Sequence, residues 1–318
     1  MQKISVSIIL PVYNAGRILE KTLKSIEKQN VSVKKIIIID DASTDNSVPI
    51  IKKFIQHSPL PFHLVTHKHN RGLSSSYNDG LNIAKTSHVV TWMQDCIAPK
   101  NGIKELLKPF IHKKSIAAAC SKLYFPDNFG KHGNFWLQCL YARNSGKIMS
   151  GRNGAFCCFS LHALKKIGMF DEKRYRTAGE DADIFYKLSK IGQIVDADIT
   201  VEHMKNNDVD FSLRQLFYKQ HQHAEALGAS FFEQSELSLK NMVRILIRPI
   251  LVFGLLVSRL QTQFLIIIVF YSFFYTKNIY KTDWRNPRII LLPFINIALL
   301  FTTTFYFFRG IITQRQQL

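Results

Sequence analysis

Acidic residues are scarce in this sequence of 318 residues: 23 aspartates and glutamates stand against 42 lysines and arginines, which gives a formal net charge of +19. Its five cysteines are odd in number and lack metal-ligand spacing, which argues against a disulfide framework. The GxGxxG and GxxxxGK[ST] motifs are absent, so neither the dinucleotide-binding nor the P-loop phosphate grip is predicted. The N-terminal apolar run ends after Leu10 in PVYN and does not predict a signal peptide.

Positive charge and apolar residues are both abundant. A charge of +19 is typical of proteins that bind nucleic acid or membrane surfaces, whereas 47% hydrophobic residues, with 24 Phe, are typical of membrane proteins. The frequent apolar runs exclude global disorder. No recognised nucleic-acid-binding module or aromatic RNA-binding pattern is present, so we predict no nucleic-acid partner.

Residues 236–318 hold ten basic and two acidic residues, and they also hold the longest apolar runs. Residues 289–308 carry no charge, and a helix of that length would span roughly 30 Å, the thickness of the hydrocarbon core of a bilayer. We therefore predict C-terminal membrane helices; a buried soluble helix pair is the alternative.

A second apolar region, 249–275, is interrupted by Arg259, Gln261 and Gln263. It is either one span with a polar middle or two short pieces, 249–258 and 264–275, that form a re-entrant or interfacial hairpin. The cost of an arginine in the middle of a membrane favours the hairpin. Every loop in this part is basic, so the positive-inside rule gives no topology.

The preceding part alternates between strand and helix patterns. The predicted strands are 6–12, 35–40, 62–66 and 88–93. The predicted helices are 17–28, 73–84 and 101–112, together with a helix after the second strand that Asp45 would cap. This alternation predicts an α/β fold with a mainly parallel sheet and helices on both faces.

Polar residues follow each of these strands: PVYN, DDASTD, HNRG and QD. Ligands of such sheets bind at the carboxyl ends of the strands. Carboxylates, amides and a guanidinium at one edge therefore predict a pocket for an anionic, hydrogen-bonding ligand.

Five segments in order resemble glycosyltransferase family 2: VSIILPVYNAGRILEKTLKSI, KKIIIIDDASTDNSVPIIKKF, NRGLSSSYNDGLNIAKTSHVVTWMQD, GRNGAFCCFSLHALKKIGMFDE and GEDADIFYKLSKIG. The resemblance implies a GT-A fold, a Rossmann-like, mainly parallel sheet, over residues 1–235. A nucleotide half would cover about 1–98 and an acceptor and catalytic half about 99–235, with membrane-associated helices at 236–318. QDCIAPKNGIKELLKPF is most similar to bacterial rhamnosyltransferase-type members.

The same resemblance assigns a nucleotide-sugar site to the edge of the sheet. Its residues would be Pro11, Val12, Tyr13, Asn14, Asp41, Arg71, Gln94 and Asp95. Asp95 falls where the family carries its metal-binding Asp-x-Asp, but the triplet is Met93-Gln94-Asp95, so the first carboxylate is missing. Mg²⁺ or Mn²⁺ would be held by Asp95 together with His203, for which a purely structural role stays open.

The resemblance also implies the catalytic and acceptor residues. Asp181, beside Glu180 in GEDAD, would be the base that takes the proton of the acceptor hydroxyl. The simpler interpretation is that these acidic residues only stabilise the start of a helix by complementing its dipole, which accounts well for Asp183. Arg152, Asn153 and Gly154 would line the acceptor side, with an ordinary loop as the alternative.

The predicted function is sugar transfer from a nucleotide-diphosphate sugar to a glycan or lipid-linked acceptor. Inversion of the anomeric carbon is expected, in the synthesis of a surface polysaccharide or glycolipid. The catalytic domain would be cytoplasmic and anchored to membrane lipids by the C-terminal helices. The alternatives are a polyprenyl-phosphate glycosyltransferase and a non-catalytic relative that binds a nucleotide or glycan.

Overall fold

The computed structural model describes residues 4–113, 115–126, 134–142, 144–149, 152, 154–204, 211–231 and 239–315. The chain forms two compact units, one from residues 1–127 with 146–208 and the other from 128–145 with 209–318. These bounds describe packing, so the predicted functional division at residue 235 stays a prediction.

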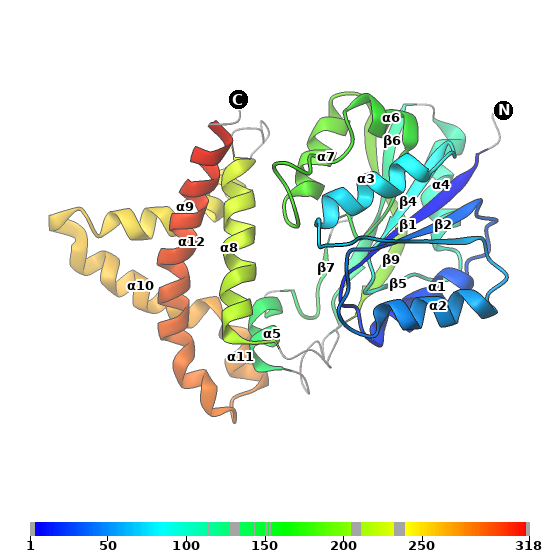
Figure 1. The fold of residues 1–318 in the computed structure, drawn as a ribbon. Coiled ribbons are helices and arrows are strands. Elements are labelled where there is room, and N and C mark those ends of the chain that lie inside the picture. Colours follow the sequence, from blue (N-terminus) through cyan, green and yellow to red (C-terminus); the bar gives the residue numbers. More distant parts are fainter. Residues whose placement is uncertain are drawn as a thin grey trace. The chain divides into compact units, whose positions relative to one another are not determined.

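The first unit is built on one sheet (Figure 1). Within the described residues the strands are β1 Val6–Val12, β2 Lys35–Asp40, β3 Phe62–Thr66, β4 His88–Trp92, β5 Cys96–Ile97, β6 Ile116–Tyr124, β7 Ile148–Met149, β8 Phe156–Ser160 and β9 Gln193–His203. Their order is β3-β2-β1-β4-β8-β6-β9-β5, with β7 beside β6. The first four strands are parallel, and β8 is antiparallel to both β4 and β6. The predicted α/β fold with a mainly parallel sheet is confirmed.

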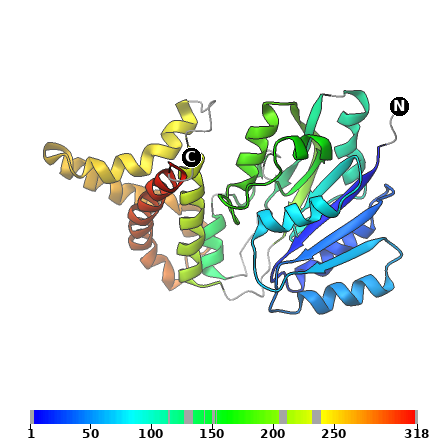
Figure 2. The same ribbon diagram turned by 45° about the horizontal axis from the view of Figure 1, so that its top comes forward.

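Helices cover both faces of this sheet (Figure 2). They are α1 Ile18–Glu27, α2 Ser47–His57, α3 Leu73–Ile83, α4 Gly102–His112, α6 Leu161–Lys166 and α7 Glu180–Ser189. The chain moves outward from β1 to β3 through α1 and α2, then returns to β4 through α3. Because such crossovers are right-handed, α3 lies on the opposite face from α1 and α2. It packs there with α6 and α7 in one apolar core.

The start of α2 differs slightly from the prediction. Asn46, rather than Asp45, directly precedes the first helical residue. Asp45 still supports the helix, because its Oδ1 accepts the N–H of Ser47 at 2.9 Å and its Oδ2 accepts that of Gly16 at 2.8 Å. The carboxylate thus joins the starts of two helices.

The second unit is helical. Its helices are α5 Phe135–Tyr141, α8 Leu213–Ala229, α9 Leu239–Gly254, α10 Gln261–Tyr275, α11 Lys277–Thr282 and α12 Leu292–Arg315. Within the described residues, one helical segment, Pro287–Thr313, is long and apolar enough to cross a membrane. The other apolar region bends by 104° between Ile245–Gly254 and Ser258–Tyr275. It therefore forms two pieces, as the hairpin alternative requires.

Candidate functional site

The loops that follow β1, β2, β3 and β4 meet at one edge of the sheet, because these strands are parallel neighbours. Asn14 ties the first loop to the second: its N–H donates to Ser43 Oγ at 3.0 Å, and its Oδ1 accepts the N–H of Thr44 at 2.8 Å. Both loops adopt left-handed backbone, with φ of 47° at Asn14 and 61° at Ala42. Such conformations persist only where neighbouring contacts hold them.

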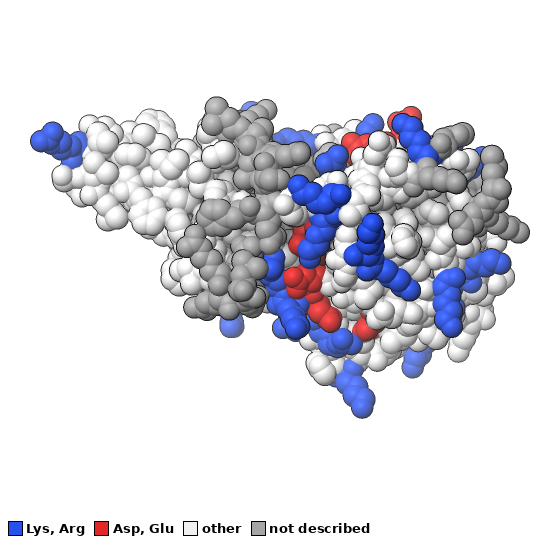
Figure 3. Space-filling model, turned by 90° about the horizontal axis from the view of Figure 1, so that it is seen from above, with Lys and Arg blue, Asp and Glu red and all other residues white. Residues whose placement is uncertain are grey.

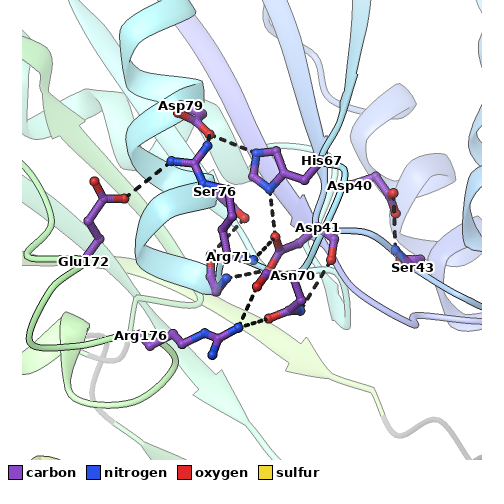
Figure 4. A network of polar contacts seen from close by, with 11 residues as sticks. Asp40, Asp41, Ser43, His67, Asn70, Arg71, Ser76, Asp79, Glu172 and Arg176 are labelled. Carbon is purple, nitrogen blue, oxygen red and sulfur yellow. Dashed lines mark hydrogen bonds and ion pairs between the residues drawn. The ribbon is translucent and has the colours of Figure 1, made fainter.

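Asp41 ties the second loop to the third (Figure 4). Its Oδ1 accepts the N–H of Arg71 at 2.7 Å and lies 2.7 Å from His67 Nδ1, and its Oδ2 accepts the N–H of Gly72 at 2.7 Å. Asp41 is only 4% exposed. Gly72 has a φ of 94°, and a Cβ there would overlap Arg176, so this turn requires glycine.

The guanidinium of Arg71 is oriented by two carboxylates. Its Nη1 lies 2.7 Å from Asp79 Oδ2, and its Nη2 lies 3.9 Å from Glu172 Oε2. His67 Nε2 contacts the same Asp79 oxygen at 2.9 Å. Asp79 therefore holds the guanidinium of Arg71 and is itself contacted by His67, as Figure 4 shows.

His67 and Asp79 were missed by sequence reasoning. His67 is the first residue after β3, where polar site residues are expected, so its position was the available signal. Asp79 lies on α3, and nothing in its local pattern indicates a contact with the preceding loop.

Gln94 joins the loop after β4 to the end of β1. Its Oε1 accepts the N–H of Tyr13 at 2.7 Å, and its Nε2 donates to the carbonyl of Tyr13 at 3.1 Å. The amide predicted to contact a nucleotide thus binds the backbone beside Tyr13, whose side chain is exposed. Pro11 and Val12 are buried in β1.

Asp95 and His203, the two predicted metal ligands, lie together. Asp95 Oδ2 is 3.4 Å from His203 Nε2, because β5 pairs with the end of β9. The ring of Phe125 stacks on that of His203, with centroids 4.9 Å apart. Within the described residues, no group of three His, Cys, Asp or Glu is placed to hold a metal. One carboxylate oxygen and one imidazole nitrogen suit a divalent cation whose other ligands are phosphate and water oxygens.

Asp181 and Glu180 line a small, partly open pocket, whose wall also includes Gly154, Tyr77 and Met93. Gly154, with a φ of 69°, brings the acceptor-side loop close: a Cβ there would lie 3.4 Å from that of Asp181. The predicted catalytic pair and one predicted acceptor residue thus share one wall.

Burial in the pocket raises the pKa of two of its side chains, Asp181 and Tyr77. Burial raises the pKa of the Asp181 carboxyl above its ordinary value, although the Ala182 N–H at 2.8 Å favours the charged form. Burial, and next the charge of Glu180, raise the pKa of Tyr77 well above its ordinary value. Tyr77 therefore stays a hydrogen-bond donor, and nothing in the local pattern of α3 indicated its place in the pocket.

The remaining predicted residues are less informative. Arg152 is exposed, and Asn153 lies outside the described residues. Asp183 is buried and pairs with Lys187 at 2.7 Å, which agrees with a structural role.

Comparisons with known proteins agree with this geometry. The model of the family described as "Glycosyl transferase family 2" matches residues 7–167, just over half of the chain. The chain belongs to this family. It is a glycosyltransferase, and the rhamnosyltransferase-type resemblance stays a prediction.

Two sequence relatives and one solved structure resemble this glycosyltransferase. Chondroitin synthase of Pasteurella multocida is 25% identical over 59% of this chain, and glycosyltransferase GlyG of Streptococcus pneumoniae is 30% identical over 42%. The chain spans only 19% and 42% of their respective lengths. The mannosyltransferase PcManGT of Pyrobaculum calidifontis, in complex with GDP-Man and Mn²⁺, matches with a TM-score of 0.56 and 15% identity. The match covers 95% of this chain and 86% of that one. It supports the GT-A fold.

Replacing Asp181 with Asn is expected to raise the thermal unfolding midpoint at neutral pH, because the amide removes a charge that burial disfavours. A carboxyl whose pKa is raised from 3.8 binds its proton more tightly in the folded state. Wild-type stability therefore falls as pH rises through the raised pKa, and the gain from Asp181→Asn should shrink as pH is lowered.

The measurement is differential scanning calorimetry at a series of pH values, from pH 7 down through the raised pKa of Asp181. Asp198→Asn is the matched control, because the side chain of Asp198 is fully exposed and its loss should leave the midpoint unchanged. A lower midpoint at pH 7 for Asp181→Asn than for Asp198→Asn would contradict the assigned burial.

Proposed function

We propose that this glycosyltransferase moves a sugar from a nucleotide-diphosphate donor to a glycan or lipid-linked acceptor in the synthesis of a surface polysaccharide or glycolipid. The observation that carries the proposal is the pocket in which Asp181, Glu180 and Gly154 meet, next to the loops that hold Arg71. The names of chondroitin synthase and of the GDP-mannose-bound mannosyltransferase support this donor and product class.

Asp181 is the base in this mechanism. Its carboxylate takes the proton from the acceptor hydroxyl while that oxygen bonds to the anomeric carbon. The bond from that carbon to the diphosphate breaks, and the nucleoside diphosphate leaves with the electron pair. A single displacement of this kind inverts the anomeric configuration. The raised pKa makes the carboxylate a stronger base than an exposed aspartate.

The four loops bind the donor. Asp41 fixes the loop that presents Arg71, whose guanidinium suits the phosphates or the base. Tyr13, with its exposed ring, flanks the base, and the buried Pro11 and Val12 fix the end of β1 from which Tyr13 extends. Asp95 and His203 are the residues that would hold Mg²⁺ or Mn²⁺, whose charge offsets that of the departing diphosphate.

A polyprenyl-phosphate acceptor is less well supported. It requires cations on the acceptor side, yet Arg174 lies 3.7 Å from Asp171, and Arg176 donates to the Asn70 carbonyl at 2.6 Å. Arg152 is the remaining exposed candidate. A non-catalytic relative is disfavoured because the GEDAD string is intact and Asp181 lines a pocket.

The proposed place of action is the cytoplasmic face of a membrane, with the C-terminal helices as anchor. The ten basic residues of 236–318 support it, since they can meet anionic headgroups beside the apolar segments.

Asp181→Asn is expected to lower kcat for sugar transfer by about 100-fold or more, since a positioned general base contributes that much. Affinity for the nucleoside diphosphate should be unchanged, because Asp181 acts on the acceptor. The assay is turnover of UDP-, GDP- and dTDP-sugars by detergent-purified protein, beside Asp198→Asn as control. Equal turnover by wild type and Asp181→Asn would exclude the assigned base.

EDTA is expected to abolish transfer and Mn²⁺ to restore it. Asp95→Asn should raise the Mn²⁺ concentration needed for half-maximal turnover by about tenfold or more, because the cation loses its carboxylate. Glu202→Gln is the matched control, being an exposed carboxylate beside His203. Equal Mn²⁺ requirements in the two variants would refute the metal assignment.

A further inference from the structure

The second unit leaves large apolar side chains uncovered on α10 and α12 and in the turn that follows α9. Leu256 is 77% exposed, Phe270 72%, Phe294 70% and Phe305 65%. In Figure 3 the arm at the left of the view is white along its length, with blue only at its end. Water-exposed surfaces rarely carry apolar patches of this extent, so another apolar phase must cover them.

The form of α10 identifies that phase as lipid. Only Ile268 and Ser272 are buried on this helix, and its apolar side chains face outward around most of its circumference. A protein partner would cover one face, whereas a helix that is apolar all round requires apolar surroundings on every open side.

Two cations near α10, Arg248 and Lys277, fit the same surroundings, and a third, Arg259 in the exposed turn before α10, requires that turn to stay at the level of the headgroups. Arg248 of α9 donates to the hydroxyls of Tyr271 at 3.0 Å and of Thr303 at 3.0 Å, so its guanidinium is bonded within the helix cluster. At the far end of α10, Lys277 lies 4.1 Å from the ring centroid of Phe274. Cations over aromatic rings are suited to the boundary between headgroups and acyl chains.

Nevertheless, α12 is not free to cross a bilayer, because α8 lies along it. Leu216 of α8 shares an apolar cluster with Leu292, at the start of α12. Further along, the ring of His221 stacks on that of Tyr306 with centroids 4.2 Å apart, and Arg309 Nε lies 3.2 Å from Glu225 Oε1.

The two helices touch through glycine. A Cβ at Gly310 would overlap the carbonyl oxygen of Glu225, and one at Gly228 would overlap that of Phe307. α8 therefore accompanies α12 over the stretch from Leu216 to Gly228, a length of roughly 18 Å at 1.5 Å per residue.

α8 is a polar helix. Its outer side carries Arg214, Gln215, Lys219 and His223, all exposed within the unit. A span formed by α12 would carry these groups into the hydrocarbon core, where charged side chains are strongly disfavoured.

The exposed side of α12 is a single stripe. Phe294, Phe301, Phe305 and Ile312 recur at intervals of 7, 4 and 7 residues, which places them on one face of a helix. Leu299 and Phe307 are buried in the unit. One apolar stripe with a polar helix alongside is the pattern of a helix that lies along a membrane surface.

We propose that the second unit is a monotopic anchor. α9, α10 and the Phe294–Ile312 stripe enter one leaflet, and α8 with both ends of α12 remains on the side from which the chain came. α10, at roughly 22 Å, is shorter than the hydrocarbon core, and the 104° bend returns the chain toward its starting side. The occupant of the apolar surface is a phospholipid leaflet. This inference goes beyond the proposed reaction and does not depend on it.

The test is the side of the membrane on which three introduced cysteines react with a membrane-impermeant maleimide. Lys52→Cys marks the first unit, Thr282→Cys precedes α12, and a cysteine appended after Leu318 follows it. All five natural cysteines are buried in the structure, so they give little background. Labelling is compared in sealed spheroplasts and in sealed inside-out vesicles, after separation of membranes from the soluble fraction.

A monotopic anchor predicts membrane-bound protein whose three cysteines all react in the same preparation and are all protected in the other. Reaction of the appended cysteine from the side opposite to Thr282→Cys would overturn the proposal, because α12 would then cross. Recovery of the full-length protein in the soluble fraction would overturn it as well, since lipid would not be the partner. Neither readout uses sugar transfer, so failure here is distinct from failure of the proposed reaction, although recovery in the soluble fraction would also overturn the proposed membrane anchor.

Discussion

The buried carboxylate of Asp41 is the constraint on which the site depends. A buried carboxylate is costly unless hydrogen bonds compensate it, and the three partners of Asp41 all come from the loop after β3. That loop can therefore take only a narrow set of conformations, and Arg71 is presented as a consequence. Hydrogen bonds of Asn14 and Gln94 fix the conformations of the loops after β1 and β4 in the same way. The edge of the sheet is therefore organised by contacts within the protein.

The change of strand direction at β8 supplies the other half of the site. Because β8 runs antiparallel to β4, the loop before it returns to the edge where the parallel strands end. Gly154 lies in that loop and approaches α7, so Asp181 faces the same pocket as Met93 from the end of β4. One sheet thereby places the edge that carries the Arg71 loop beside the carboxylate of Asp181, the proposed base.

Strong local patterns account for what the sequence predicted. β1 and β2 are buried on both faces and read as continuous apolar runs, and α1 buries the face that its periodicity indicated. Contacts between distant segments could not be predicted from local sequence patterns. Examples are the hydrogen bond between Gln94 and the backbone of Tyr13, and the position of His67 between Asp41 and Asp79. Hydropathy likewise identified α12 as apolar but carried no information that the polar α8 lies along it.

The loops tied by Asp41 are proposed to form the nucleotide site. Isothermal titration with UDP, GDP and dTDP in the presence of Mn²⁺ tests this proposal most directly, with the wild type, Asp41→Asn and the exposed control Asp198→Asn. An asparagine cannot accept all three hydrogen bonds, and leaving buried donors unpaired costs about 1–3 kcal/mol. We expect Asp41→Asn to weaken nucleoside diphosphate binding about tenfold or more, with Asp198→Asn unchanged. Equal affinity of Asp41→Asn and the wild type would contradict the account.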